Sequence, residues 1–151
     1  MSIRNQISIE IAEEVIESVL EKLQECKNEL APFLQALTDA DRRGMLKLGD
    51  RSIPTVQKVK SYVDTNPEFL PGYMSKEEFL KDEKVVTQLS PVVNILRQLT
   101  SDVSDTQMLA GSEAFQAALL YYGQVREADQ KGVTSAKPIY QDLKQRFSKK
   151  K

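Results

Sequence analysis

The sequence predicts an all-α protein: an up-and-down four-helix-type bundle with short accessory helices and a C-terminal helix. Apolar residues recur at alternating steps of four and three along the long segments, which is the spacing of one helix face. Runs that alternate apolar and polar residues, as strands do, are absent from the sequence. The chain has 151 residues, so we expect one domain over residues 1–151.

The first segment carries the clearest apolar face. Its members are Ala12, Ile16, Val19, Leu23, Cys26, Leu30, Phe33 and Leu37. Ser8 is the expected N-cap, and Pro32 should kink or break the helix near Ala31, because proline removes a backbone hydrogen bond. We expect Cys26 to pack in a core rather than to react. The glutamates Glu10, Glu14, Glu17 and Glu21 share another face, which favours a solvated stripe over a Ca²⁺ or Mg²⁺ site.

The middle of the chain predicts two more helices and a folded connector. Residues 38–41 resemble the capped start of a short helical turn that carries Met45, Leu46 and Leu48. The next helix, capped by Asp50 or Ser52, should end at Asn66-Pro67. Residues 67–74 are too apolar for a free linker, so we expect them to fold over a bundle end. Ser75 should cap a third helix, which Pro91 kinks or divides.

The fourth helix is expected to run from about Asp105 or Ser112 to Gly132, before a last helix with Ile139, Tyr140, Leu143 and Phe147. Ala110, Ala114 and Ala118 form a small-residue face that lets another helix approach closely, with Phe115, Leu119 and Tyr122 opposite. This composition predicts the most buried long element of the bundle. Any face left open, with Leu120 and Tyr121, would be a partner or dimer surface.

Several short motifs resemble a family of small uncharacterised bacterial proteins. They are Gly49-Asp50, Asn66-Pro67-Glu68, Asp105-Thr106 and the run Gly111–Leu119, in this order. The resemblance covers Leu37 to Phe147. It implies a bacterial, all-helical and non-secreted protein, and since the family has no established activity, it implies no ligand and no catalytic residue.

The composition argues against several classes of site. The chain has no histidine and one cysteine, which removes the usual transition-metal ligands and the commonest general base within one chain. The sequence contains neither a P-loop nor a Gly-x-Gly-x-x-Gly motif. The formal net charge of −1 disfavours nucleic-acid binding. We therefore expect no cofactor, no metal and no catalytic constellation, and a disordered tail at Lys149–Lys151.

The sequence also indicates where the chain works. The N-terminus shows no secretory signal, no apolar run reaches the ~20 residues that span a bilayer, and the single cysteine fits a reducing compartment. We expect a cytoplasmic protein without a membrane span.

The leading hypothesis is a non-enzymatic cytoplasmic helical scaffold or protein-interaction module, which binds a protein partner or forms a homo-oligomer. The alternative is a bundle that binds a small molecule or lipid-like ligand between its helices near Asp82, Tyr122 and Tyr140. Asp82 extends the apolar stripe of the third helix backwards, although pairing with a neighbour or capping would equally explain it. A third reading is an enzyme that uses only carboxylates and tyrosines. The candidate ligand or interface residues are Asp82, Ala114, Ala118, Tyr121, Tyr122 and Tyr140.

Overall fold

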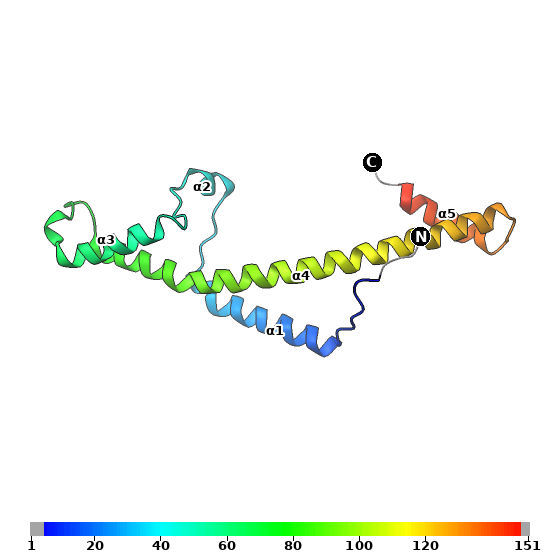
Figure 1. Cartoon of the computed structure of the whole chain (residues 1–151), viewed down its shortest axis with the longest axis horizontal. Helices are drawn as coiled ribbons and strands as arrows, with labels where there is room; N and C mark the ends of the chain where they lie inside the picture. Colours follow the sequence, from blue (N-terminus) through cyan, green and yellow to red (C-terminus); the bar gives the residue numbers. More distant parts are fainter. Residues whose placement is uncertain (1–4, 149–151) are drawn as a thin grey trace. The chain divides into compact units, whose positions relative to one another are not determined.

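The computed structural model describes residues 5–148, and every regular element in this range is a helix (Figure 1). In chain order the elements are α1 (Glu13–Leu30), η1 (Ala31–Phe33), α2 (Asp39–Gly44), α3 (Ile53–Thr65), η2 (Pro67–Phe69), α4 (Lys76–Gln130) and α5 (Ala136–Ser148). The all-helical prediction is confirmed. The four-helix up-and-down arrangement stays a prediction, and the predicted disordered tail Lys149–Lys151 lies outside the described residues.

The chain divides into two compact units. One unit, Ile11–Arg97, holds α1, η1, α2, α3, η2 and the first part of α4. The other holds the rest of α4 and α5, together with residues 5–10. Each unit is described below by itself.

Helix α1 is shorter than its apolar pattern. Its N-cap is Ala12, which offers no side-chain hydrogen bond, so the predicted cap at Ser8 is wrong. The α-helix ends at Leu30, and Pro32 lies in the 3-10 turn that follows. The predicted break near Ala31 is thus confirmed, since proline cannot donate the hydrogen bond that would continue the helix.

Local capping chemistry explains how α2 and α4 begin. The Asp41 amide donates to Thr38 Oγ1 at 3.2 Å and the Thr38 amide donates to the Asp41 carboxylate at 3.0 Å, which is the predicted capping box. However, α2 ends at Gly44, so Met45, Leu46 and Leu48 follow this helix instead of belonging to it. At the start of α4 the Glu78 amide donates to Ser75 Oγ at 3.2 Å, as predicted.

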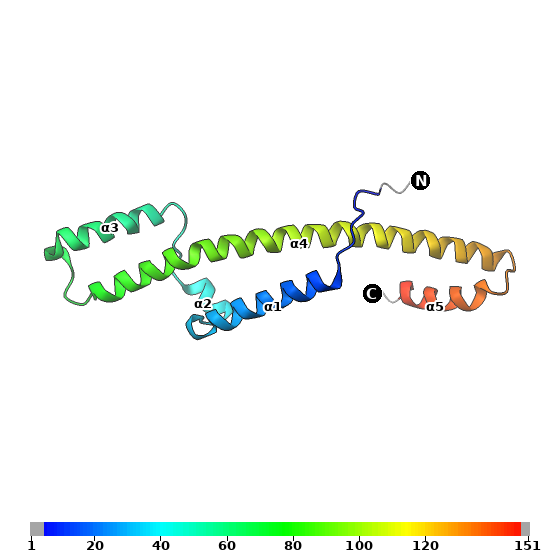
Figure 2. The same cartoon turned by 90° about the horizontal axis from the view of Figure 1, so that it is seen from below.

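Helix α3 begins and ends largely as expected. Pro54 lies in its first turn, and the helix stops at Thr65, just before Asn66 and Pro67. Ser52 is the N-cap residue by position, but its side chain accepts no capping hydrogen bond. Figures 1 and 2 both show α3 running back along the first turns of α4.

Helix α4 joins the predicted third and fourth helices into one. It continues through Pro91, so of the two expected outcomes, a kink or a division, the division is wrong. The predicted start near Asp105 or Ser112 is also wrong, since both residues lie inside this helix. Within it, two hydroxyl groups bond to backbone carbonyls one turn earlier. Thr106 Oγ1 donates to the Asp102 carbonyl at 2.8 Å, and Ser90 Oγ donates to the Val86 carbonyl at 2.7 Å.

Few side chains are buried. Among the described residues the buried hydrophobic side chains are Val63, Val125 and Ala136. The sequence predicts that Ala114, Phe115, Ala118, Leu119 and Tyr122 make this part of α4 the most buried, but Phe115 is 50% exposed and Leu119 is 44% exposed, so that prediction is wrong for the single chain. The sequence shows that a helix face is apolar. That face is buried only where a neighbouring element packs against it.

Candidate functional site

An aromatic cluster joins α5 to the end of α4 in one unit. The Tyr122 and Tyr140 rings stack with centroids 5.8 Å apart, and Phe147 lies 4.7 Å from Tyr122 and 6.3 Å from Phe115. Gly132, with a φ of 81°, ends α4, and the Val133 amide donates to the Ala128 carbonyl at 3.0 Å. This turn lets α5 run back along α4 (Figure 2).

The structure therefore brings two of the candidate residues, Tyr122 and Tyr140, into contact. Partial burial, together with the neighbouring Tyr140, raises the pKa of Tyr122 above its ordinary value of 10.0. The Tyr122 phenol is consequently neutral at physiological pH. The stacked pair contributes apolar packing area between α4 and α5.

The small-residue face of α4 meets the N-terminal segment of the same unit. Residues 7–10, with Ala110, Glu113 and Ala114, line an open hollow of about 550 Å³. The Gln6 amide donates to Glu113 Oε1 at 2.6 Å. Ala114 and Ala118 are themselves exposed, so the expected helix crossing at these alanines is not formed within this unit.

In the other unit the carboxylate with a defined role is Glu83 instead of Asp82. Asp82 is exposed, whereas the Glu83 side chain is only 9% exposed and accepts from Lys60 Nζ at 2.5 Å. Hydrogen bonds from Lys60 and Thr87 hold the pKa of Glu83 below its ordinary value of 4.5, although burial opposes this shift. Lys76 and Asp64 form a second ion pair at 2.9 Å. The two ion pairs connect α3 to α4.

Sequence reasoning missed the Lys60–Glu83 pair. The spacing of Glu83 and Thr87 on one helix was visible, and Thr87 Oγ1 does donate to Glu83 at 3.0 Å. However, Lys60 lies 23 residues away in the chain. Only the packing of α3 against α4 reveals that it is the partner.

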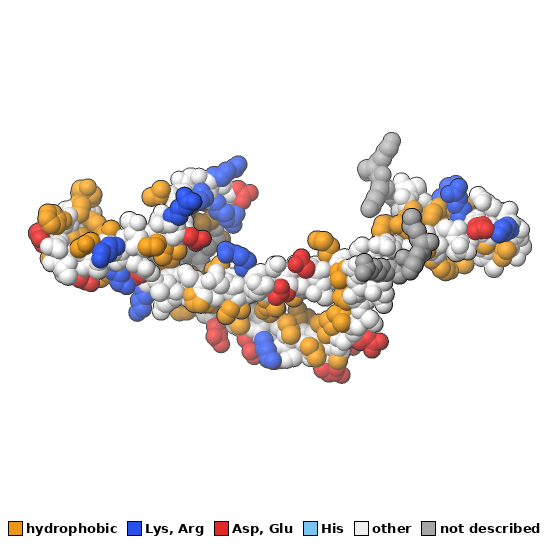
Figure 3. Space-filling model, viewed as in Figure 1, with side chains coloured by type: hydrophobic (Ala, Val, Ile, Leu, Met, Phe, Trp, Pro, Cys, Tyr) orange, Lys and Arg blue, Asp and Glu red, His pale blue; other side chains and the backbone are white. Residues whose placement is uncertain are grey.

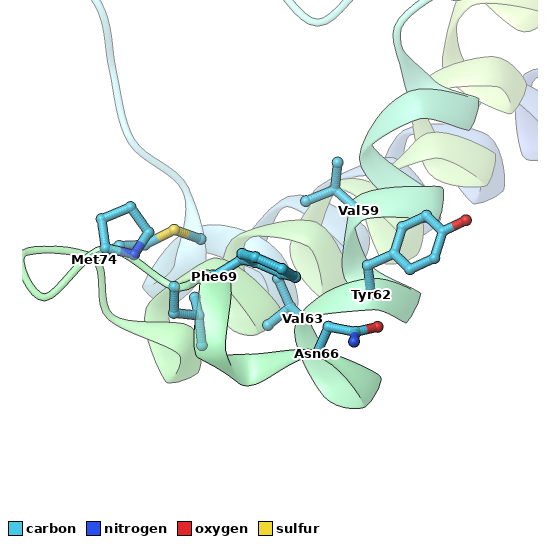
Figure 4. A pocket seen from close by; sticks show the side chains of 8 residues that line it. Val59, Tyr62, Val63, Asn66, Phe69 and Met74 are labelled. Carbon is cyan, nitrogen blue, oxygen red and sulfur yellow. The ribbon is translucent and has the colours of Figure 1, made fainter.

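An apolar pocket lies where the connector folds onto α3. Its volume is about 580 Å³, and its walls are Val59, Tyr62, Val63, Asn66, Phe69, Leu70, Pro71 and Met74. Figure 4 shows the Phe69 ring next to Val63. The polar atoms of Asn66 are already engaged, since Nδ2 donates to Glu68 at 3.0 Å and Oδ1 accepts from Thr65 at 3.1 Å. The connector thus folds over the apolar face of α3. The predicted ligand site near Asp82, Tyr122 and Tyr140 is a different place, since none of these residues lines the pocket.

Helix α1 presents an apolar face without any buried residue. Exposed hydrophobic side chains on it include Val15, Ile16, Val19, Leu20 and Leu23, and Figure 3 shows hydrophobic side chains at the surface of this helix. Cys26 is also exposed, so its predicted core packing is wrong. The predicted solvated stripe of Glu10, Glu14, Glu17 and Glu21 is exposed.

Three further observations bear on function. Residues 5–148 contain no group of three or more side chains that could hold a metal ion. None of the helices in this range is both long enough and apolar enough to cross a membrane. Comparisons with protein-family models, with curated proteins and with solved structures found no match to this chain.

Proposed function

We propose that this chain is a non-enzymatic helical protein-interaction module. The observation that carries the proposal is the apolar face of α1, which is regular in sequence and has no buried residue, with Ile16, Val19 and Leu23 exposed. Most helix stability in proteins comes from packing an apolar face, and no residue of this 18-residue helix is buried. A protein partner that covers this face would supply that packing.

The titratable groups support an interaction module over an enzyme. The carboxyl groups with a lowered pKa each have a structural partner: Asp41 bonds to Thr38 in a helix cap, Glu68 accepts a hydrogen bond from Asn66, Glu83 pairs with Lys60, and Glu127 pairs with Lys131. These shifts stabilise helix ends and helix contacts. They are spread along the chain rather than gathered in one cleft.

The setting of this module is part of the proposal. The resemblance to small bacterial proteins and the single cysteine support a bacterial cytoplasm. We propose that the up-and-down four-helix-type arrangement is completed when the exposed faces are covered in the assembly. That partner is a second protein or another copy of this chain.

Substitution of Leu20 tests the proposal. Leu20 is 61% exposed on α1, so Leu20→Glu should leave the chain folded but weaken association through this face. Leu46→Glu is the matched control, because Leu46 lies outside the helices and is also exposed. Light scattering over a range of concentrations, and pull-downs with both variants, measure the effect. A wild-type chain that stays monomeric and retains no partner would contradict the proposal.

A second candidate function is the binding of a lipid-like ligand. The pocket between α3 and the connector favours it, since its walls are almost wholly apolar and its volume of about 580 Å³ is that of a small-molecule site. A fluorescent long-chain fatty acid is a suitable probe. Phe69→Ser should weaken its binding about tenfold or more, whereas Phe33→Ser, at an exposed phenylalanine outside the pocket, should not. Equal effects of both substitutions would exclude this pocket.

A further inference from the structure

The apolar face of α1 is self-complementary when two copies run antiparallel. Its positions are Ala12, Ile16, Val19, Leu23, Cys26 and Leu30, and they are symmetric about Glu21. Two antiparallel copies therefore place Ile16 of one chain against Cys26 of the other, Val19 against Leu23, and Ala12 against Leu30. Alternating steps of three and four are also the spacing of a two-helix seam.

On this pattern we propose that the partner of α1 is α1 of a second copy of this chain, bound antiparallel. This inference rests on the proposed interaction function and names the partner. The whole helix belongs to one unit, and none of its residues is buried within it. Five of the six positions that the pairing uses are exposed, and the sixth, Leu30, is half-buried.

The charges beside the face favour the antiparallel direction. Glu13 and Lys27 flank the seam on one edge, and antiparallel pairing sets each Glu13 beside Lys27 of the other copy, which makes two opposite-charge pairs. Leu20, between them, meets Leu20 of the second copy. On the other edge, Lys22 of one copy lies beside Lys22 of the second copy, which makes one like-charge contact. In a parallel pair, each Lys22 would instead face Lys27 of the other copy, so both charged contacts would be repulsive.

The remaining acidic residues do not oppose this pairing. Glu14, Glu17, Glu21 and Glu25 lie away from the seam by their spacing along the helix, Glu29 lies beside the seam opposite Val15 of the other copy, and all five are exposed. They stay in solvent when the apolar faces meet. The acidic stripe therefore keeps the outer surface of the pair soluble instead of separating the two chains.

Cross-linking tests the pairing and its direction. Ile16→Cys provides a second thiol that should lie opposite the native Cys26 of the other copy, so a short bismaleimide should give a covalent dimer joined at 16 and 26. The same positions within one helix are about 15 Å apart along its axis, beyond the reach of the short linker. The two controls carry one cysteine each: the wild-type chain, and Ile16→Cys with Cys26→Ser. Neither should cross-link efficiently, whereas a parallel pair would join Cys26 to Cys26 in the wild type.

A charge exchange tests the flanking contacts. Glu13→Lys turns two attractive contacts into repulsive ones and should raise the dimer dissociation constant about five- to tenfold. The double change Glu13→Lys with Lys27→Glu should restore it. Glu14→Lys is the matched control, since it removes the same charge from the same first turn but on the outer side, and it should change the constant less than about twofold.

The outcomes separate this inference from the proposed function. A cross-link between 16 and 26, with rescue by the double charge exchange, supports the antiparallel pair. If the wild-type chain self-associates or retains a protein partner without that cross-link and without rescue, the inference is wrong and the interaction module stands. If the chain is monomeric at all concentrations and retains no partner, both proposals fail.

Discussion

The aromatic cluster predicts how strongly α5 is held to α4. Phe147→Ala removes both ring contacts of this side chain, with Tyr122 at 4.7 Å and with Phe115 at 6.3 Å. Each aromatic pair is worth about 0.5–1.5 kcal/mol, so the loss should be about 1–3 kcal/mol. Because Phe147 is partly exposed, the larger cost of emptying a closed core does not apply, and we expect about 2 kcal/mol.

Hydrogen exchange of the α5 amides measures this loss directly. A local destabilisation of about 2 kcal/mol should accelerate their exchange about 30-fold, while amides in α3 should be unaffected. Tyr121→Ala is the control, because Tyr121 is the neighbour of Tyr122 in α4 but is exposed, so its loss should cost within ~0.5 kcal/mol. If Phe147→Ala and Tyr121→Ala accelerate exchange of α5 equally, the ring contacts do not hold this helix.

Three further predictions follow from α4. Pro91→Ala should stabilise the chain by up to about 3 kcal/mol, since it restores a donor for the Thr87 carbonyl inside a continuous helix, and a lower urea midpoint would argue against that continuity. Ala118→Leu should change the free energy of unfolding, measured by urea denaturation, by less than ~0.5 kcal/mol because Ala118 is exposed. A loss of about 1–3 kcal/mol would indicate that another helix crosses there. Lys60→Met should lower the free energy of unfolding at neutral pH, because ionised Glu83 loses its partner. The difference in this free energy between wild type and variant should shrink below pH 4.5, because the pair stabilises the fold only while Glu83 is ionised. Exposed Lys84→Met is the control for the last comparison and should show no such pH dependence.

Local patterns in the sequence predicted the elements whose causes are local. The break at Pro32, the capping box at Thr38 and the end of α4 at Gly132 each depend on a few neighbouring residues, and the structure has all three. Local reasoning was wrong where two outcomes are close in energy. The predicted starts at Asp105 or Ser112 both lie inside α4, where the hydroxyls of Ser90 and Thr106 bond back into the helix, so one long helix replaces two.

The candidate ligand or interface residues show the same difference between what local patterns predict and what packing decides. Tyr122 and Tyr140 were expected near each other because both lie on the apolar faces of neighbouring helices, and they do stack. Asp82 was singled out for its register, but the carboxylate with a partner is the adjacent Glu83, because Lys60 reaches that side of α4. A shift of one residue turns a side chain by about 100° around a helix, so the choice between them depends on the packing of α3.

By itself the sequence determined that this chain is helical, which faces are apolar, and where some helices begin or end, because spacing and capping act over a few residues. The tertiary structure decided which of those faces are covered. Val19 and Phe147 lie on equally regular apolar faces, yet Phe147 packs against Tyr122 while Val19 is 43% exposed. The physical reason is that burial depends on two surfaces meeting, and a single helix pattern describes only one of them.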